Sequence, residues 1–373
     1  MRRENSKSFI TELFNFAGIE LNGSHPWDIQ IHNDAFYSRL IKEESLGLGE
    51  AYMDGWWDCE QLDQFFERII AYNIEDKIDH TLHLKLKIFI AKIINHQTKK
   101  RALQVGKKHY DIGNNLFKIM LDSRMNYSCG YWKNASTLEE AQRNKLELAC
   151  QKLMLKPGMR VLDIGCGFGA FAKYAAQNYG VSVCGVTISK KQYEYAIKNC
   201  SGLPIEIKFL DYRDITGEYD RIVSIGMFEH VGPLNYLDYF HLVKKSLKKQ
   251  GLFLLHSIGA NTSQAISDEW ISTYIFPEGV IPSIPQISTA FEGLFVMEDW
   301  QNFGSDYDKT LMAWHHHFNQ QWASIKNDYD DRFFRMWNYY LLSCAGSFRA
   351  RYLQLWQIVL SNGGIPQGSQ AIR

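Results

Sequence analysis

Short apolar runs alternate with stretches of helical spacing along the last two thirds of the chain. Apolar residues recur every three or four positions at 138–155, before the first of these runs, and at 171–178, between the first and the second. This is the spacing of amphipathic helices. Seven segments have the composition of strands: residues 161–164, 181–187, 204–210, 219–225, 252–257, 294–297 and 356–360. Alternation of strand and helix predicts an α/β fold with a doubly wound, seven-stranded sheet. We expect its last strand to run antiparallel.

The N-terminal part of the chain has a different pattern. Apolar residues keep helical spacing through most of residues 8–72, interrupted by short glycine-containing turns, and a short strand fits residues 28–31. This predicts a small, mostly helical N-terminal domain over residues 1–80. It has no nucleophile–base pair and no metal-ligand spacing, so we expect it to serve scaffolding, dimerisation or substrate presentation.

Residues 80–110 carry basic side chains and no Asp or Glu. Lys85, Lys92 and Lys99 repeat every seven residues beside apolar residues at helical steps, which predicts a basic amphipathic helix and linker over residues 81–108. Such a helix can lie on an anionic membrane surface, each lysine adding about 1 kcal/mol near the head groups. It can equally pack on a protein core with a solvated cationic face.

Composition excludes several classes of protein. Net charge is zero over 373 residues, so there is no global electrostatic footprint for nucleic acid. The seven cysteines are scattered without a C-x-x-C pair, which argues against a disulfide framework or a zinc site. The sequence shows no secretory signal and no 18-residue apolar run, so we expect a cytoplasmic protein. We expect the catalytic domain to occupy residues 109–373.

The strand at 161–164 leads into a glycine-rich loop. Asp163 is followed by Gly165, Gly167 and Gly169, so the spacing is G-x-G-x-G and not the G-x-G-x-x-G of pyrophosphate loops. The shorter spacing suits a nucleoside without pyrophosphate, of which S-adenosylmethionine is the common one. A glycine-rich turn of another nucleotide-binding fold is the alternative interpretation.

The second strand lacks the acidic residue that usually binds the ribose hydroxyls at its end. Thr187 stands there, followed by Ser189 and Gln192. Gln192 is therefore the candidate for the ribose or the methionine tail. These residues also fit a capping box, with Ser189 as the N-cap and Gln192 reaching back to it.

Two further segments supply candidate contacts to the nucleoside. Asp211, Tyr212 and Arg213 follow the third strand, where an acidic residue commonly lies near adenine, although an ion-paired turn is the simpler interpretation. Tyr127 and Ser128 belong to an aromatic stretch without periodicity, typical of a pocket wall. We expect them to contact the methionine end of the donor.

Candidate catalytic residues lie where strands end. Glu229 follows the fourth strand and His256 ends the fifth, so both point to the edge where open α/β sheets build active sites. His256 is either pocket-lining or a core histidine, and the neighbouring glutamate favours the first. Cys129 is a pocket wall or a nucleophile without a visible base. Tyr307 is a further candidate pocket residue.

Taken in order, these motifs resemble the bacterial cyclopropane-fatty-acyl-phospholipid synthases, within the wider group of methyltransferases similar to mycolic acid cyclopropane synthases. The resemblance extends over nearly the whole chain, and Thr187 fits it. The matching stretches are residues 45–57, 109–115, 127–132, 161–169, 185–189, 211–214, 224–232, 253–259, 302–314 and 344–351.

The resemblance implies a class I methyltransferase sheet and transfer from S-adenosylmethionine onto the cis double bond of an acyl chain in a membrane phospholipid. It implies a homodimer at the inner face of the cell membrane and a bound bicarbonate ion that acts as the base. The residues that it assigns to the anion are Cys129, Glu229, His256, Ile258 (through its backbone) and Tyr307. Cys344 matches a cysteine proposed as catalytic, although no base partners it in the sequence.

Two other functions stay open at this point. A related methyltransferase could stop at a methyl or methylene branch, which proton NMR of the product distinguishes from a ring. A membrane-associated lipid-binding protein with an inactive site is disfavoured by the intact glycine loop and the Glu229 and His256 pair. Release of S-adenosylhomocysteine in the presence of phospholipid vesicles would separate that protein from an enzyme.

Overall fold

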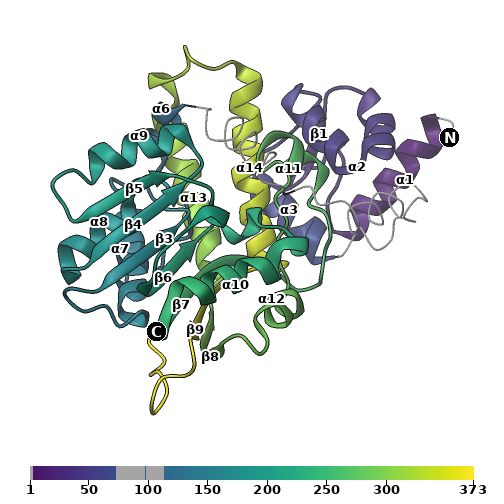
Figure 1. Ribbon diagram of the computed structural model, residues 1–373. Helices are drawn as coiled ribbons and strands as arrows, with labels where there is room; N and C mark the ends of the chain where they lie inside the picture. Colours follow the sequence, from purple (N-terminus) through teal and green to yellow (C-terminus); the bar gives the residue numbers. More distant parts are fainter. Residues whose placement is uncertain (1–2, 73–96, 98–112) are drawn as a thin grey trace. The chain divides into compact units, whose positions relative to one another are not determined.

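The computed structural model describes residues 3–72, 97 and 113–373 (Figure 1). The chain forms two compact units. Unit 1 comprises residues 1–88, 267–277 and 307–353, and unit 2 comprises residues 89–266, 278–306 and 354–373. The predicted boundary at residue 80, and the basic helix and linker at 81–108 except Gln97, lie outside the described residues.

Unit 2 contains the predicted seven-stranded sheet, in the order β5-β4-β3-β6-β7-β9-β8. The strands that pair in parallel are β3 (Arg160–Ile164), β4 (Ser182–Thr187), β5 (Ile205–Phe209), β6 (Tyr219–Ile225) and β7 (Leu247–Ala260). The last strand, β9 (Leu353–Ser361), runs antiparallel to β8 (Val296–Asn302). The fold class and the antiparallel last strand are confirmed.

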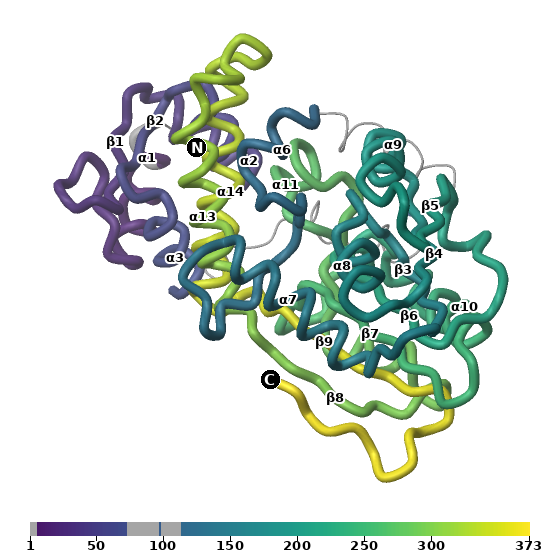
Figure 2. The backbone as a smooth tube through the Cα atoms, turned by 90° about the vertical axis from the view of Figure 1, so that its left-hand side faces the viewer, coloured from purple at the N-terminus to yellow at the C-terminus, as the bar shows by residue number. Residues whose placement is uncertain are grey.

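Helices cover both faces of the sheet, and successive strand residues point to opposite sides (Figure 1 and Figure 2). Val161 packs with α7 (Leu138–Lys152) and α8 (Ala170–Tyr179), whereas Leu162 packs with α10 (Tyr236–Ser246) and α12 (Ile284–Phe291). Burial on both faces explains why these strands are continuous apolar runs. The remaining helices of unit 2 include α6 (Asn114–Met120) and α9 (Lys190–Asn199).

Unit 1 combines three separate segments of the chain. Its elements are α1 (Arg3–Phe16), β1 (Ile29–Ile31), α2 (Ala35–Met53), β2 (Trp57–Cys59), α3 (Leu62–Ala71), α11 (Glu269–Tyr274), most of α13 (Ser305–Gln321) and α14 (Asp331–Arg349). Helix α14 packs so closely on α3 that a Cβ on Gly346 would stand 2.6 Å from the Asp63 carbonyl oxygen. Trp270 of α11 is buried against Gly49 of α2 in the same way. The helical N-terminal segment and the strand near residues 28–31 are as predicted.

Element boundaries differ from the sequence expectation at the C-terminal side of the sheet. The strand expected at 294–297 is β8, which begins at Val296 and continues to Asn302. Strand β2 and helices α11 and α12 were not predicted. Among the described residues, none of the helices combines the length and the apolar character that crossing a membrane requires.

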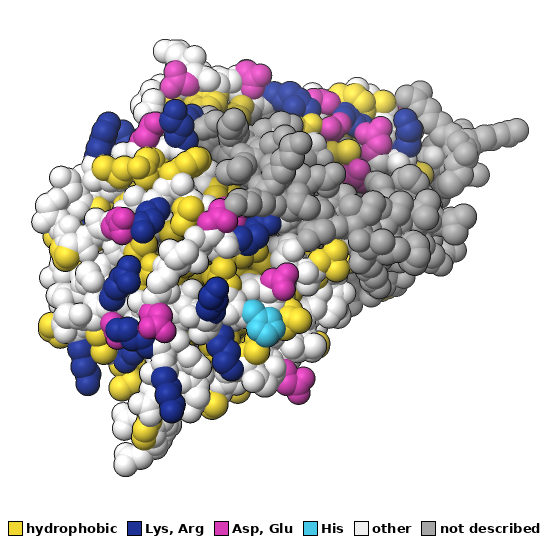
Figure 3. All heavy atoms as spheres, in the orientation of Figure 1, with side chains coloured by type: hydrophobic (Ala, Val, Ile, Leu, Met, Phe, Trp, Pro, Cys, Tyr) yellow, Lys and Arg dark blue, Asp and Glu magenta, His cyan; other side chains and the backbone are white. Residues whose placement is uncertain are grey.

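Basic side chains are dispersed on the face of the molecule drawn in Figure 3. Lysine and arginine residues of unit 2 stand there among apolar and acidic ones, with no continuous basic patch in the described part of that face. The one cation-rich stretch of the sequence, residues 80–110, is outside the described residues apart from Gln97.

Candidate active site

The glycine loop joins β3 to α8 at the carboxyl edge of the sheet. Its first N–H groups, those of Gly165 and Cys166, both donate to the Val186 carbonyl oxygen at 3.0 Å. Gly165 has φ 80°, and a Cβ there would lie 2.7 Å from the Met227 side chain, so the turn requires glycine. A Cβ on Gly167 would meet no protein atom within 4 Å. The loop therefore leaves open space at Gly167 where a ligand can approach the backbone.

Asp163 provides an unsatisfied acceptor next to this loop. The residue is 2% exposed, and none of the described residues provides a hydrogen-bond partner for its Oδ2. Burial raises the pKa of Asp163 to about 7, although the positive charge of Lys145 opposes the shift. Buried polar atoms in folded proteins are nearly always partnered, so this oxygen points to a ligand or water. The loop and Asp163 fit a bound nucleoside with a cationic group.

Thr187, Ser189 and Gln192 form a closed set of hydrogen bonds at the end of β4. Ser189 is the N-cap of α9 and accepts from the Gln192 N–H at 3.3 Å, as predicted. The reciprocal bond of a capping box is absent, because the Ser189 N–H donates to Thr187 Oγ1 at 3.2 Å. Gln192 Oε1 accepts the Thr187 hydroxyl at 3.0 Å instead. Their role at the ribose stays a prediction.

Asp211 and Arg213 form an ion-paired turn, the simpler of the two interpretations. Asp211 is the N-cap of a short 3-10 helix, and its carboxylate accepts Arg213 Nε at 2.8 Å and Nη2 at 3.1 Å. The guanidinium also lies 5.0 Å from the centre of the Tyr212 ring. This pair fixes the loop beyond β5 and leaves adenine binding a prediction.

Glu229 and His256 belong to adjacent strands, as predicted, but His256 does not end its strand, because β7 continues beyond it to Ala260. Strands β6 and β7 pair in parallel with Ile225 opposite His256, and Glu229 follows in the 3-10 helix Phe228–His230. Glu229 Oε1 accepts the Ile258 N–H at 2.7 Å, whereas its buried Oε2 has no partner in the part of the chain that the structure describes. Removal from water raises the pKa of Glu229 to about 7. The N–H that the resemblance assigns to an anion is thus donated to Glu229 here.

His256 is a buried, neutral imidazole. It is 1% exposed, and burial, assisted by the charges of Lys145 and Lys152, lowers its pKa well below the ordinary value. Its Nδ1 lies 3.3 Å from the amide nitrogen of Gln357 on β9, and its Nε2 meets no hydrogen-bond partner among residues 3–72, 97 and 113–373. Gln357 was missed, although a glutamine within an apolar strand is the same kind of signal that singled out His256. Two buried atoms for which the described residues offer no partner, Glu229 Oε2 and His256 Nε2, therefore belong to neighbouring strands β6 and β7 and the turn that follows β6.

The loop before β3 contributes the remaining predicted residues of unit 2. Cys129 is fully buried, and its thiol lies 3.1 Å from the Gly130 carbonyl oxygen. Ser128 Oγ accepts a hydrogen bond from Lys145 Nζ at 2.9 Å. The Tyr127 ring packs edge-on against Phe117, with centroids 5.1 Å apart. Lys145 was not singled out from the sequence, although a lysine on the apolar side of a helix is a recognisable signal.

Tyr307 and Cys344 belong to unit 1. The Tyr307 ring stacks on Phe348 at 4.6 Å, and its place in the anion site stays a prediction. Burial raises the pKa of the Cys344 thiol to about 12, with a further contribution from the charge of Asp268. A thiol of that pKa is a poor nucleophile near neutral pH, which argues against a catalytic role for Cys344.

The sequence matches one family model and has curated relatives. Residues 97–358 match the family described as mycolic acid cyclopropane synthetase. The chain is 54% identical over 96% of its length to the cyclopropane-fatty-acyl-phospholipid synthase of Escherichia coli K12, covering 94% of that protein. It is 33% identical over 68% of its length to cyclopropane mycolic acid synthase MmaA2 of Mycobacterium tuberculosis, covering 95% of that protein.

Solved structures show the same fold. The structure of MmaA2 from Mycobacterium tuberculosis superposes with TM-score 0.66 and 32% identity, over 70% of this chain and 98% of that one. Mycolic acid cyclopropane synthase CmaA1, complexed with SAH and CTAB, gives TM-score 0.66 at 31% identity, over 70% of this chain and 98% of that one. Coclaurine N-methyltransferase, at 24% identity and TM-score 0.71 over 84% of this chain and 98% of that one, supports the fold alone. The chain belongs to the mycolic acid cyclopropane synthetase family of S-adenosylmethionine-dependent enzymes.

Proposed function

We propose that this enzyme transfers a methylene group from S-adenosylmethionine to the cis double bond of an unsaturated acyl chain in a membrane phospholipid, forming a cyclopropane ring. The observation that carries the proposal is the 54% identity to a cyclopropane-fatty-acyl-phospholipid synthase over 94% of that protein. The paired, unsatisfied Glu229 and His256 agree with it, because ring formation requires a site that accepts a proton.

The donor would be held by the glycine loop and Asp163. The open space at Gly167 admits the nucleoside, and the free Asp163 oxygen suits its ammonium group. Tyr127 and Ser128 would contact the methionine end, and Thr187, Ser189, Gln192 and the Asp211–Arg213 turn would surround the ribose and adenine. S-adenosylmethionine supplies a methyl group on a positively charged sulfur, a strong electrophile toward the weakly nucleophilic alkene. The contribution of the protein is to hold the two in line.

Aromatic side chains next to His256 suit the positive charge that methyl transfer leaves on the acyl chain. The Phe303 ring centre lies 5.7 Å from that of His256 and 5.3 Å from that of Tyr131. An aromatic face stabilises a desolvated cation by about 2 kcal/mol. Loss of one proton from the transferred methyl group then closes the ring.

Bicarbonate is the base in this proposal. Bound bicarbonate would supply a small anion that accepts the proton released on ring closure. A neutral His256 can donate a hydrogen bond from Nε2, and a Glu229 with raised pKa can carry a proton on Oε2, so both can hold an anion. Cys129, the Ile258 backbone and Tyr307 complete the site that the family resemblance implies.

A peripheral location at the inner face of the cell membrane and a homodimer also belong to the proposal. The phospholipid substrate requires access to a membrane, and the basic residues at 80–110 supply charge for an anionic surface. Binding to anionic and to zwitterionic vesicles, compared at low and high salt, tests this part.

The experiment for the main reaction measures S-adenosylhomocysteine release with phospholipid vesicles. Vesicles of cis-unsaturated phospholipid should support release, whereas vesicles of fully saturated phospholipid should not. Release that is independent of the double bond would overturn the proposal, and no release with any vesicle would favour a lipid-binding protein.

A second candidate is methyl transfer that ends in a branch. It is favoured by the 29% identity, over 89% of this chain, to tuberculostearic acid methyltransferase UfaA1 of Mycobacterium tuberculosis. A ring and a methylene branch have the same added mass, so proton NMR of the fatty esters decides between them. Ring protons at high field support the first candidate, and olefinic methylene protons support the second.

A further inference from the structure

One face of α7 lies against the loop that carries Tyr127, Ser128 and Cys129. The Tyr131 N–H donates to the Ala141 carbonyl oxygen of this helix at 2.8 Å. A Cβ on Gly130 would lie 2.9 Å from Ala141 Cβ, so the loop backbone approaches the helix as closely as a glycine allows. The conformation of the loop is thus set by α7.

Two polar side chains of α7 hold this loop from the same side. Lys145 is 1% exposed, and its Nζ lies 2.9 Å from Asn126 Oδ1 and 2.9 Å from Ser128 Oγ. Gln142, which is fully buried, donates from Nε2 to the Ser128 carbonyl oxygen at 2.7 Å. Asn126 is anchored in turn, because its N–H and its amide donate to the Asp122 carboxylate at 2.7 and 2.9 Å.

Lys145 differs from the other buried lysine of the same helix. Lys152 pairs with a carboxylate, since its Nζ lies 3.0 Å from Asp299 and 2.6 Å from the Gln301 side chain. The hydrogen-bond acceptors that the described residues offer to Lys145 are neutral. Burial lowers the pKa of Lys145 to about 8, although the charges of Asp122, which holds Asn126, and of Asp163 oppose the shift. Burying this ammonium group is expensive, and a neutral side chain could hold the same loop. A buried positive charge at this position can act on the carboxylates near it, of which Asp163 lies next to the glycine loop.

We propose that Lys145 and Gln142 are positioning residues for the donor: they fix Tyr127, Ser128 and Cys129 at the pocket and place a positive charge close to the Asp163 carboxylate. This inference rests on the proposed use of S-adenosylmethionine. The charge of Lys145 is the opposing influence on the pKa of Asp163, which burial raises. An ionised Asp163 with a free oxygen is the acceptor that the ammonium group of the donor needs.

The test compares two substitutions in the same helix. S-adenosylhomocysteine affinity is measured by titration calorimetry, together with thermal unfolding, for the full-length wild type, Lys145→Met and the matched control Lys152→Met. Both variants should lose stability because both remove a buried hydrogen-bonding group. We expect the dissociation constant to rise at least about tenfold for Lys145→Met and to stay within about twofold of wild type for Lys152→Met.

Equal affinity in Lys145→Met and wild type, or equal weakening in both variants, would overturn the inference. A wild type without affinity for S-adenosylhomocysteine would overturn the proposed function itself, which is a different result. If Lys145→Met does not fold, Asn126→Ala, which removes one acceptor of the ammonium group and keeps the lysine, decides the question. At least threefold weaker binding by that variant supports the inference, and unchanged binding contradicts it.

Discussion

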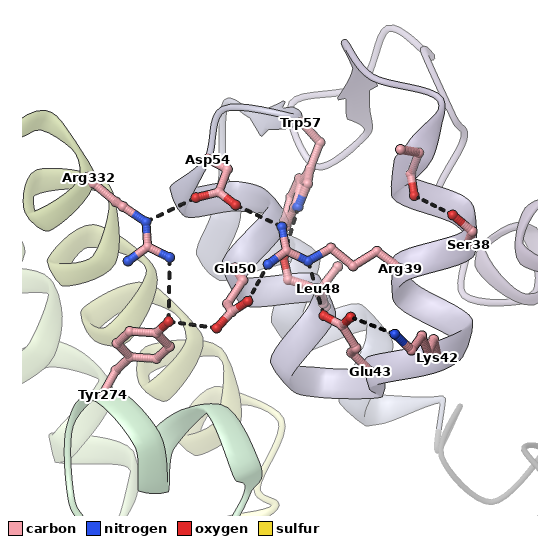
Figure 4. A network of polar contacts seen from close by, with 11 residues as sticks. Ser38, Arg39, Lys42, Glu43, Leu48, Glu50, Asp54, Trp57, Tyr274 and Arg332 are labelled. Atoms are coloured by element: carbon pink, nitrogen blue, oxygen red, sulfur yellow. Dashed lines mark hydrogen bonds and ion pairs between the residues drawn. The ribbon is translucent and has the colours of Figure 1, made fainter.

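Polar groups are arranged in opposite ways in two regions of this molecule. In unit 1, Arg39 donates to Glu43 at 3.2 Å, to Asp54 at 2.7 Å and also to Glu50, and Arg332 holds the other oxygen of Asp54 at 3.0 Å (Figure 4). The Tyr274 hydroxyl completes the set by donating to Glu50 at 2.7 Å. In the candidate active site of unit 2, by contrast, Asp163, Glu229 and His256 each have a buried atom for which the described residues offer no partner.

The difference separates structural from functional polarity. The charged side chains of the first region are partly exposed and paired with one another. They fix the geometry of the helices that carry them and need no ligand. Buried unsatisfied atoms cost stability and persist in a native fold where a ligand or water meets them. Substitutions in the first region should therefore change stability, and substitutions in the second should change binding and turnover.

The largest effect is expected at Glu229. Glu229→Gln keeps the shape and the hydrogen bond to the Ile258 N–H but removes the ionisable group. We expect turnover to fall about 100-fold or more, with S-adenosylhomocysteine affinity unchanged and no recovery on adding bicarbonate.

A matched control for this substitution is Glu298→Gln in β8. That carboxylate is already bonded to the Ile365 and Ser369 N–H groups at 3.2 Å and also to the Ser361 hydroxyl. The turnover of Glu298→Gln should stay within about twofold of wild type. Undiminished turnover in Glu229→Gln, with and without bicarbonate, would remove Glu229 from the anion site.

Arg39→Met is the corresponding change in unit 1. It leaves three carboxylates without the cation that joins them, and we expect the free energy of unfolding in urea to fall by about 2–3 kcal/mol. Affinity for S-adenosylhomocysteine should not change. Lys42→Met is the control, because Lys42 is 82% exposed and lies 3.9 Å from Glu43, so it should cost less than about 0.5 kcal/mol. Equal losses in the two variants would contradict a stabilising network.

Stability should respond to pH with opposite sign in the two regions. Burial raises the pKa of Asp54, but its bonds to Arg39 and Arg332 outweigh burial and hold the pKa below the ordinary value. Its contribution is present above the unfolded-state pKa and is lost as the pH falls through the folded-state pKa. Glu229, whose pKa is raised to about 7, stabilises below about pH 4.5 and loses that contribution as the pH rises through 7.

The pH dependence at Glu229 is measurable by comparing the unfolding free energies of the wild type and Glu229→Gln. Between about pH 5 and pH 8, the unfolding free energy of Glu229→Gln should improve relative to wild type by about 1–3 kcal/mol. Chemical unfolding of both proteins at each pH gives the value. A difference that does not depend on pH would show that the pKa of Glu229 is not raised in the folded protein.

A smaller effect is expected at Gln357. Gln357→Leu removes the amide next to His256 Nδ1 and should lower turnover about tenfold and stability by about 1–2 kcal/mol. Steady-state kinetics and urea unfolding measure both. Gln354→Leu on the same strand, which loses a bond to the Asn302 amide at 2.9 Å, should lower stability without the tenfold loss of turnover. Similar kinetics in the two variants would mean that Gln357 does not act through His256.

The sequence predicted the sheet where helices bury both of its faces. Strands β3, β4 and β6 are continuous apolar runs for that reason, and their bounds agree within a residue or so. Edge strand β8 was misplaced, because Val296 and Met297 are half exposed and the strand continues through the polar residues that follow.

The candidate site was predicted as far as the order of neighbouring strands allowed. Glu229 and His256 could be paired because they were assigned to consecutive strands of a parallel sheet, although β7 continues past His256 to Ala260. The contact between His256 and Gln357 depends on β9, a strand 100 residues later, lying beside β7, which no local pattern records. Lys145 was overlooked because a lysine in a predicted helix is by default assigned to the solvated face.

The most direct test of the central claim is the bicarbonate dependence of ring formation by the wild-type enzyme. Turnover on cis-unsaturated phospholipid vesicles is measured in buffer freed of carbon dioxide, and then with increasing bicarbonate. If Glu229 Oε2 and His256 Nε2 hold an anion that takes the proton, the rate should fall in the depleted buffer. It should recover as bicarbonate is added and level off once the site is saturated. A rate that is the same in both buffers would contradict the account.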